Sequence, residues 1–316
     1  MGRGEKREVS RKDAKNAKLR ILSFAFLASL RENLIMAHPA LEQTAHRPWP
    51  LPPGAWRWRQ SWRDLLFAHW PVPVEAVRRL IPPALEVDTF DGVTWLGIVP
   101  FRMAGVMLRP LPDLPWISAF PELNVRVYVT RDGQPGVWFL SLDATRLPAV
   151  IAARVLFHLP YYWAKIDITN NGDAFDYRCE RVAAIPRPWG GVAGRGEEDP
   201  LPNPLPGGEG TGGERARAML AVRYRPTSRV YTAAPGTLEH WLTERYALYA
   251  AAADGTLYRT EVHHHPWPLQ QAAAEFTANS ISAAGGLPVV GPPALLHFAR
   301  RIDVVIWQPE RVAIDR

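Results

Sequence analysis

Lysine is nearly absent from the chain beyond residue 35, where the single Lys165 stands against 27 arginines. A Schiff base with a carbonyl substrate requires a primary amine whose pKa can be lowered. Arginine cannot supply such an amine, because its guanidinium stays protonated in proteins. Any amine-dependent carbon–carbon chemistry in this part of the chain therefore depends on Lys165.

Cysteine and long apolar runs are also scarce. Cys179 is the only cysteine, which excludes an intrachain disulfide and a thiolate zinc cluster and fits a reducing, cytoplasmic location. No run reaches the ~20 apolar residues of a spanning helix, so we expect no membrane partner. The ten-residue run 21–30, which is mostly apolar, resembles a signal peptide, but Arg31 and Glu32 follow at once without an evident cleavage site.

Charge is concentrated at the start of the chain. Residues 1–35 contain nine basic and four acidic side chains, whereas the remainder is nearly balanced. A nucleic-acid partner would require a basic face in the folded body, and none is indicated. We expect residues 1–45 to be a disordered extension, or an over-long reading of a chain whose translation starts at Met36.

The remaining residues, 46–316, are predicted to form a single domain with one insertion. Between Pro186 and Glu214, 15 of 29 residues are glycine or proline. Such a composition cannot bury a core, so residues 186–216 are predicted to be a disordered insertion.

Short strands dominate the predicted domain, which we assign to the mainly β (α+β) class. The clearest hairpin pairs residues 122–130 with residues 137–142, because aliphatic and polar side chains alternate with a period of two. A second hairpin is expected to pair 85–87 with 93–102 around Asp91-Gly92. Helices are expected at residues 73–81, 147–159 and 238–249, the last with Thr237 as its N-cap.

Several segments together resemble the YqjF-like family of uncharacterised proteins, which is similar to the acetoacetate decarboxylase superfamily. The resemblance covers about residues 56–312 outside the insertion, and the combination of segments is more specific than any one of them. The segments that carry it are Phe67–Pro73 (FAHWPVP), Ile81–Gly92, Val99–Met103, Phe120–Arg126, Phe139–Asp143, Tyr224–Thr227, Leu238–Tyr246 and His264–Leu269. The resemblance implies an antiparallel β-cone or barrel around a small-molecule cavity, with a few peripheral helices.

The same resemblance indicates where a site would lie. In the decarboxylases a proline precedes two adjacent lysines, one of which forms the Schiff base. Here Pro160 precedes Tyr161 and Tyr162, and Lys165 does not match that motif. On a strand Lys165 would share a face with Tyr161, so a cavity-facing Tyr162 would exclude Lys165 from the cavity.

The decarboxylases also use a glutamate on an upstream strand, and Glu122 resembles it. Their arginine has no convincing counterpart, and His69 or Arg102 are the nearby alternatives. Glu122 could be an acid or base, while Tyr161 or Tyr162 could donate hydrogen bonds to a carbonyl. We expect Glu122 and Tyr162 to face one cavity.

Asn124 and Arg126 share the strand face of Glu122. If this face lines a cavity, the three side chains could orient a small carboxylate or carbonyl, with Arg126 as a bidentate partner. If it faces outward, they are ordinary solvated residues of a half-buried strand. The alternation of side chains alone does not decide between these two interpretations.

Other combinations of residues give weaker hypotheses. Glu261, His263 and His265 alternate on one strand and have the composition of a metal site, but such residues are as often surface or packing residues. Gly285-Gly286 lacks the pattern of a nucleotide-binding loop. We therefore expect no metal and no cofactor.

Three functions follow in order of preference. The first is binding of a small polar or acidic metabolite in the cavity, with Schiff-base-independent acid/base chemistry a further possibility. The second is a non-catalytic ligand-sensing or protein-interaction module. The third is a decarboxylase-like lyase that uses Lys165. The sequence leaves open whether any reaction is catalysed and what the oligomeric state is.

Overall fold

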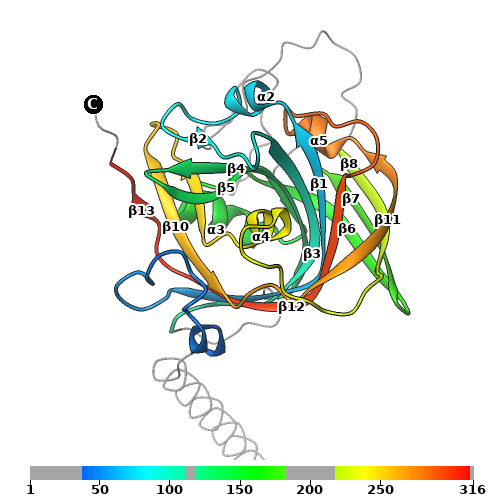
Figure 1. Cartoon of the computed structure of the whole chain (residues 1–316), viewed down its shortest axis with the longest axis horizontal. Helices are drawn as coiled ribbons and strands as arrows, with labels where there is room; N and C mark the ends of the chain where they lie inside the picture. Colours follow the sequence, from blue (N-terminus) through cyan, green and yellow to red (C-terminus); the bar gives the residue numbers. More distant parts are fainter. Residues whose placement is uncertain (1–37, 111–117, 183–217, 314–316) are drawn as a thin grey trace, which may run out of the picture.

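The computed structural model describes residues 38–110, 118–182 and 218–313, and it is mainly β with few short helices, as the sequence predicts (Figure 1). None of the helices within these ranges has the length and apolarity that crossing a bilayer requires. The elements are η1 (Pro39–Glu42), β1 (Trp58–Val72), α2 (Val74–Arg78), β2 (Glu86–Val87), β3 (Thr94–Leu108), β4 (Phe120–Arg131), β5 (Gln134–Ala144), α3 (Leu147–Phe157), β6 (Tyr161–Asn171), β7 (Ala174–Arg181), β8 (Met219–Pro226), α4 (Leu238–Thr243), β9 (Ala247–Ala251), β10 (Leu257–His264), β11 (Leu269–Asn279), α5 (Ile281–Ala284), β12 (Leu295–Ile306) and β13 (Glu310–Arg311).

The strands form one sheet whose hydrogen bonding closes on itself. Their order is β13-β10-β9-β5-β6-β7-β8-β11-β12-β1-β3-β4-β2, and the additional pairings β10–β12 and β4–β5 close it into two rings. Both rings contain β12, β1, β3, β4 and β5, which form a shared wall. Pairing is antiparallel except that β5 runs parallel to β6 and to β9. In the view of Figure 1, α4 lies near the centre, with strands of the sheet around it.

The shared wall is buried on both faces. On β4, Leu123, Val125 and Val127 belong to one hydrophobic core, together with residues of β6, β7 and β8. Tyr128 of the same strand belongs to the second core, with Phe67 of β1. Because both faces are covered, the polar side chains that alternate along β4 are inside the protein and not in solvent.

Two local predictions were wrong because long-range pairing overrides local preference. The strand β2 pairs with β4 and not with β3, although Asp91 and Gly92 still form a turn with positive φ between Phe90 and Val93. The predicted helix over 238–249 ends at Thr243, and its last residues, from Ala247 on, belong to β9, which pairs with β5 and β10. The Thr237 cap is confirmed, because its side chain accepts from the His240 N–H.

Strand β11 was missed altogether. Its sequence LQQAAAEFTAN is rich in helix-forming alanine, glutamine and glutamate. The segment is nevertheless extended, because its backbone pairs with β8 on one side and β12 on the other. Intrinsic propensity is a weak prior against such tertiary pairing.

An N-terminal arm packs on the outside of β10. We use this name for residues 38–57, which precede β1. Residues 38–45 were expected to belong to the extension, but they include η1 and contact the folded domain, since the His263 Nε2 lies 2.7 Å from the Ala40 carbonyl oxygen. Residues 1–37 and the whole predicted insertion, 186–216, lie outside the described residues.

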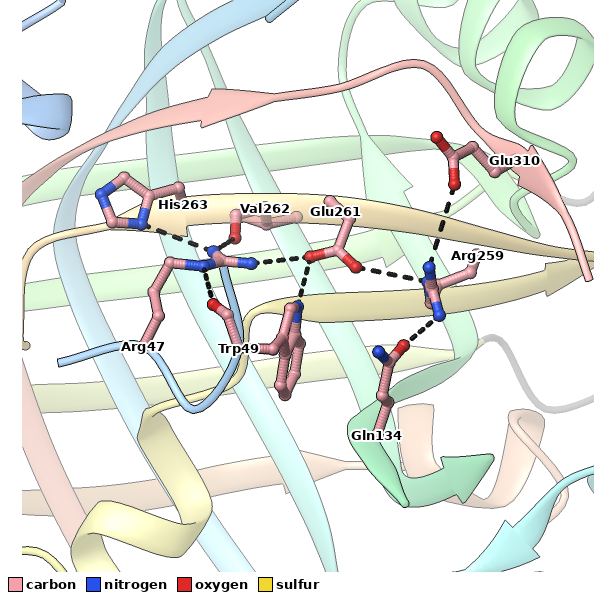
Figure 2. Close-up of polar contacts among 8 residues, drawn as sticks. All are labelled: Arg47, Trp49, Gln134, Arg259, Glu261, Val262, His263 and Glu310. Carbon is pink, nitrogen blue, oxygen red and sulfur yellow. Dashed lines mark hydrogen bonds and ion pairs between the residues drawn. The ribbon is translucent and has the colours of Figure 1, made fainter. Parts of the chain in front are cut away.

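A buried ion pair fixes the arm to β10 (Figure 2). The Arg47 Nη2 donates to the Glu261 Oε2 at 2.7 Å, and the Arg47 Nη1 donates to the Val262 carbonyl oxygen at 2.6 Å. The Trp49 indole N–H donates to the same Glu261 oxygen at 2.9 Å. The side chains of Arg47 and Glu261 are only 1% and 6% exposed, so neither charge has water as an alternative partner. The Glu261–His263 face considered as a metal site is thus covered by the arm.

We expect Arg47→Met to lower the free energy of unfolding by about 3 kcal/mol, because it leaves the buried Glu261 carboxylate without its main partner. The double variant Arg47→Met/Glu261→Gln should recover much of this loss. The exposed Arg301–Asp303 pair is the control, and Arg301→Met should cost less than about 1 kcal/mol. Urea unfolding of the full chain measures all three, and equal losses for Arg47→Met and Arg301→Met would refute this role of the arm.

Candidate functional site

A cavity of about 220 Å³ lies on the second-core side of the shared wall. Most of its lining is aromatic or aliphatic, and a smaller polar group lies among these residues. Its partly exposed lining residues gather where β1 begins and α3 ends, so we take this as the mouth; they include Trp58, Gln60, Ala152, Leu156 and Phe157. The Trp58 and Phe157 rings lie 4.5 Å apart at this position.

The polar group follows the inward face of β4. Glu122, Asn124 and Arg126 all line the cavity, and each is less than a tenth exposed. They are opposite Phe101, Val99 and Gly97 of β3, so the row runs along the wall from the side of α3 to the side of α4. The structure thus brings together the three residues that the alternation in the sequence grouped on one face.

Tyr161 completes the acidic end of this row. Its hydroxyl donates to the Glu122 Oε2 at 3.0 Å, and it lines the cavity from the first position of β6. The Tyr177 hydroxyl donates to the Glu122 backbone carbonyl at 2.8 Å, which fixes the strand at this point. Glu122 is therefore held between two tyrosines in a nearly dry environment.

Burial raises the pKa of Glu122 to about 8. The hydrogen bond from Tyr161 works in the opposite direction, and the negative charge of Asp143 raises the pKa further. The main cause is the cost of placing a carboxylate where little water can solvate it. Glu122 is consequently a neutral carboxylic acid near pH 7, able to donate a proton or a hydrogen bond.

Tyr162 does not line the cavity, so the expectation that it faces the same cavity as Glu122 was wrong. Successive residues of a strand point to opposite sides, and here Tyr161 is the inward one. The Tyr162 ring instead lies 3.8 Å from the guanidinium carbon of Arg181. That guanidinium binds the fully buried Asp143 through two bonds of 2.7 and 2.8 Å.

Arg126, at the other end of the row, is a buried cation whose hydrogen-bond partners are neutral, and the cation of Arg245 is close enough to interact with it. Its Nη2 lies 3.4 Å from both the Tyr128 hydroxyl and the Leu242 carbonyl oxygen, and its guanidinium carbon lies 5.3 Å from the centre of the Phe67 ring. Its Nε has no hydrogen-bond partner, and no carboxylate among the described residues pairs with it.

Glycine at position 97 makes room for this arrangement. A Cβ there would lie 3.2 Å from the His69 Nε2 and 3.3 Å from the Arg126 Cγ. His69 itself is fully buried but does not line the cavity, and its Nε2 lies 2.7 Å from the Tyr128 hydroxyl. Because that hydroxyl donates to the Leu242 carbonyl at 3.0 Å, His69 must donate to it. His69 therefore supports the neighbours of Arg126 and is not positioned to touch a ligand.

The sequence did not single out Arg245, Thr243 or His264, which also line the cavity. Arg245 is paired with Asp88 at 2.5 Å, and its guanidinium carbon lies 4.2 Å from the Trp241 ring, yet its Nη2 has no partner. The Asn124 Oδ1 is likewise buried without a partner. Nothing in the local pattern around Arg245 could have revealed this, because the segment resembled an uninterrupted helix.

Two other candidate residues lie away from the cavity. Arg102 is half-buried, donates to the Ile168 carbonyl oxygen at 3.2 Å and pairs with Asp64 at 3.4 Å. Lys165 is exposed on β6 and does not line the cavity. Within the described parts of the chain, no group of three or more His, Cys, Asp or Glu side chains is arranged to hold a metal ion.

Comparison with solved structures shows the same fold. Acetoacetate decarboxylase from Legionella pneumophila is similar with a TM-score of 0.51 and 12% identity, over 88% of this chain and 98% of that one. The enduracididine biosynthesis enzyme MppR complexed with pyruvate is similar with a TM-score of 0.51 and 12% identity, over 88% and 96% of the two chains. At such identities the similarity concerns the fold alone.

Comparison of sequences gives the family. The uncharacterized protein YqjF of Bacillus subtilis (strain 168) is 40% identical over 257 residues, which are 81% of this chain and 93% of the relative. The model of the DUF2071 family, described as an uncharacterized conserved protein, matches residues 59–303. That match includes the whole polar row of β4 and both arginines of the cavity, and the chain therefore belongs to the DUF2071 family.

Proposed function

We propose that this protein binds a small carboxylic acid in the cavity, with the carboxylate on Arg126 and with Glu122 and Tyr161 beside the rest of the ligand. The observation that carries the proposal is the buried Arg126 guanidinium, which has no carboxylate partner among the described residues. The Asn124 Oδ1 and the Arg245 Nη2 are two further unpartnered polar atoms of residues that line the same cavity.

Burying a charge inside a protein costs free energy. A guanidinium removed from water is unfavourable unless an anion and hydrogen bonds compensate it. A ligand carboxylate would supply both, since guanidinium and carboxylate can form two parallel hydrogen bonds. Among the described residues, the buried charges of Arg47, Asp143 and Arg245 each have a partner of opposite charge. Arg126 has none there, and a bound anion would supply one.

At the Glu122 end of the polar row, the chemistry would be proton transfer without a covalent intermediate. A protonated Glu122 can donate to a carbonyl or enolate oxygen, as acids with a raised pKa do in other sites. Tyr161, hydrogen-bonded to it, can orient the carboxyl group, while burial raises the pKa of Tyr161 so that the tyrosine keeps its own proton. The names of two proteins with the same fold, acetoacetate decarboxylase and MppR complexed with pyruvate, concern oxo acids and support an acid of this kind.

Two alternatives remain distinct from this proposal. A non-catalytic module that senses the same acid, or that contacts another protein, is favoured by the absence of lysine from the cavity lining. A lyase that uses Lys165 is opposed by the exposed position of that residue on β6. The proposal includes a cytoplasmic location, for which the single, buried Cys179 is the support.

Arg126→Gln should weaken binding of carboxylic acids at least about 30-fold, because it removes the charged partner of the ligand. Arg102→Gln is the matched control, since Arg102 does not line the cavity, and it should leave affinity unchanged. A thermal-shift series with oxo and hydroxy acids of three to nine carbons, followed by calorimetry, measures both variants. Equal losses in the two variants, or no stabilisation of the wild type by any acid, would contradict the proposal.

Glu122 should make the native state less stable as the pH rises from the ordinary glutamate pKa of 4.5 to about 8. In this window Glu122 has lost its proton in the unfolded chain but retains it in the native state. The free energy of unfolding therefore falls by up to about 1.4 kcal/mol per pH unit. Below and above the window both states carry the same charge, and the effect is constant. Urea unfolding of the wild type and Glu122→Gln at pH 5 to 8.5 should show their difference changing with pH; a constant difference would refute the raised pKa.

Borohydride reduction in the presence of an oxo acid should leave Lys165 unmodified. Lys165 is exposed and lies outside the cavity, so a ligand bound in the cavity would not place its carbonyl beside this amine. Mass mapping of the reduced protein, with Lys165→Arg as the control, detects any adduct. An adduct on Lys165 at the stoichiometry of the ligand would favour the lyase alternative instead.

A further inference from the structure

We propose that the acid bound here has an aryl-sized apolar tail, with a hydrogen-bond acceptor on its ring, and is not a short acid of two to four carbons. This inference rests on the proposed function and names its substrate class. Three features of the cavity lead to it: an aromatic wall beside Arg126, the length of the polar row, and two unpartnered indole groups.

The aromatic wall starts at Arg126 itself. The guanidinium carbon lies 5.3 Å from the centre of the Phe67 ring, which meets the Trp267 ring edge-on at 4.8 Å. Trp267 is stacked with Trp62 at 5.8 Å, and Trp62 meets Phe101 at 6.0 Å. All four rings line the cavity. A ligand anchored on Arg126 would therefore have an unbroken series of aromatic rings beside its tail.

Strand register shows that this wall runs alongside the polar row. Gly97 is opposite Arg126 on one side and His69 on the other, which puts Phe67 near the Arg126 end. Phe101 is opposite Glu122, and Trp62 is opposite Met103, so these two rings belong to the Glu122 end. A ligand along the wall thus has a polar side facing β4 and an apolar side facing β1 and Trp267.

The length of the row favours a long ligand. Arg126 and Glu122 are four strand residues apart, or about 13 Å between Cα atoms at ~3.3 Å per residue. Arg126 contacts Tyr128 and Leu242, away from Glu122, while Glu122 contacts Tyr161, so the two side chains do not close this separation. A three-carbon acid is about 4 Å long, given carbon–carbon bonds of ~1.5 Å, and cannot reach both ends.

The wall also contains polar groups that a pure hydrocarbon would leave unsatisfied. Both Trp62 and Trp267 line the cavity, and their buried indole N–H groups have no hydrogen-bond partner. Buried donors are nearly always paired, with protein, water or ligand. An oxygen on the ring of the ligand would give at least one of these donors an acceptor.

The test compares propanoate, 3-phenylpropanoate and 3-(4-hydroxyphenyl)propanoate by calorimetry on the full chain. We expect the phenyl ring to tighten binding at least about 10-fold, as burial of a phenyl group should, and the ring hydroxyl to tighten it further. If propanoate binds as tightly as both ring-bearing acids, the inference is wrong while the proposed function stands. If the phenyl ring tightens binding but the ring hydroxyl does not, the proposed hydrogen-bond acceptor on the ring is refuted. If no acid binds, the proposed function itself fails.

Variants of the wall separate this effect from general apolarity. Trp62→Leu should lose at least about 5-fold in affinity for 3-phenylpropanoate while leaving propanoate unchanged, because leucine removes the ring but keeps the site apolar. Trp163→Leu is the matched control, since Trp163 is half-buried on β6 and outside the cavity. Phe101→Leu replaces Trp62→Leu if that variant does not fold. Equal effects of the wall and control variants would overturn the inference.

Discussion

Burial of β4 on both faces is the constraint on which the site depends. One face supplies Leu123, Val125 and Val127 to one hydrophobic core, and the opposite face supplies Phe120 and Tyr128 to the second core. Glu122, Asn124 and Arg126 therefore project into a cavity and not into bulk water. In that environment burial raises the pKa of the Glu122 carboxyl group, which therefore keeps its proton near pH 7.

The way the chain treats its other buried charges makes Arg126 distinctive. Asp143 is fully buried and bound by both nitrogens of Arg181, and Glu261 is bound by Arg47 beneath the N-terminal arm. The cation at the end of the β4 row has hydrogen bonds to a hydroxyl and a carbonyl but no anion. In the proposed function, a ligand carboxylate would be the partner of this cation.

Much of this site could be predicted from local sequence, and the rest depended on long-range pairing. Alternation on β4 grouped Glu122 with Arg126, but it could not say that both faces were buried, because the covering strands lie far away in the sequence. The inward position of Tyr161 instead of Tyr162 depends on the parallel pairing of β6 with β5. Arg245 and strand β11 were missed for the same reason: their local sequences resemble a helix, and partner strands impose a different conformation.

We infer that one buried guanidinium, that of Arg126, receives the carboxylate of a ligand whose tail extends toward the mouth. A crystal structure of the complex with 3-phenylpropanoate tests this most directly. We expect the carboxylate to bind Arg126, the phenyl ring to pack against Trp62 and Phe101, and Glu122 to keep its hydrogen bond with Tyr161. A carboxylate bound at Glu122, or a ligand bound outside the cavity with Arg126 unchanged, would contradict it.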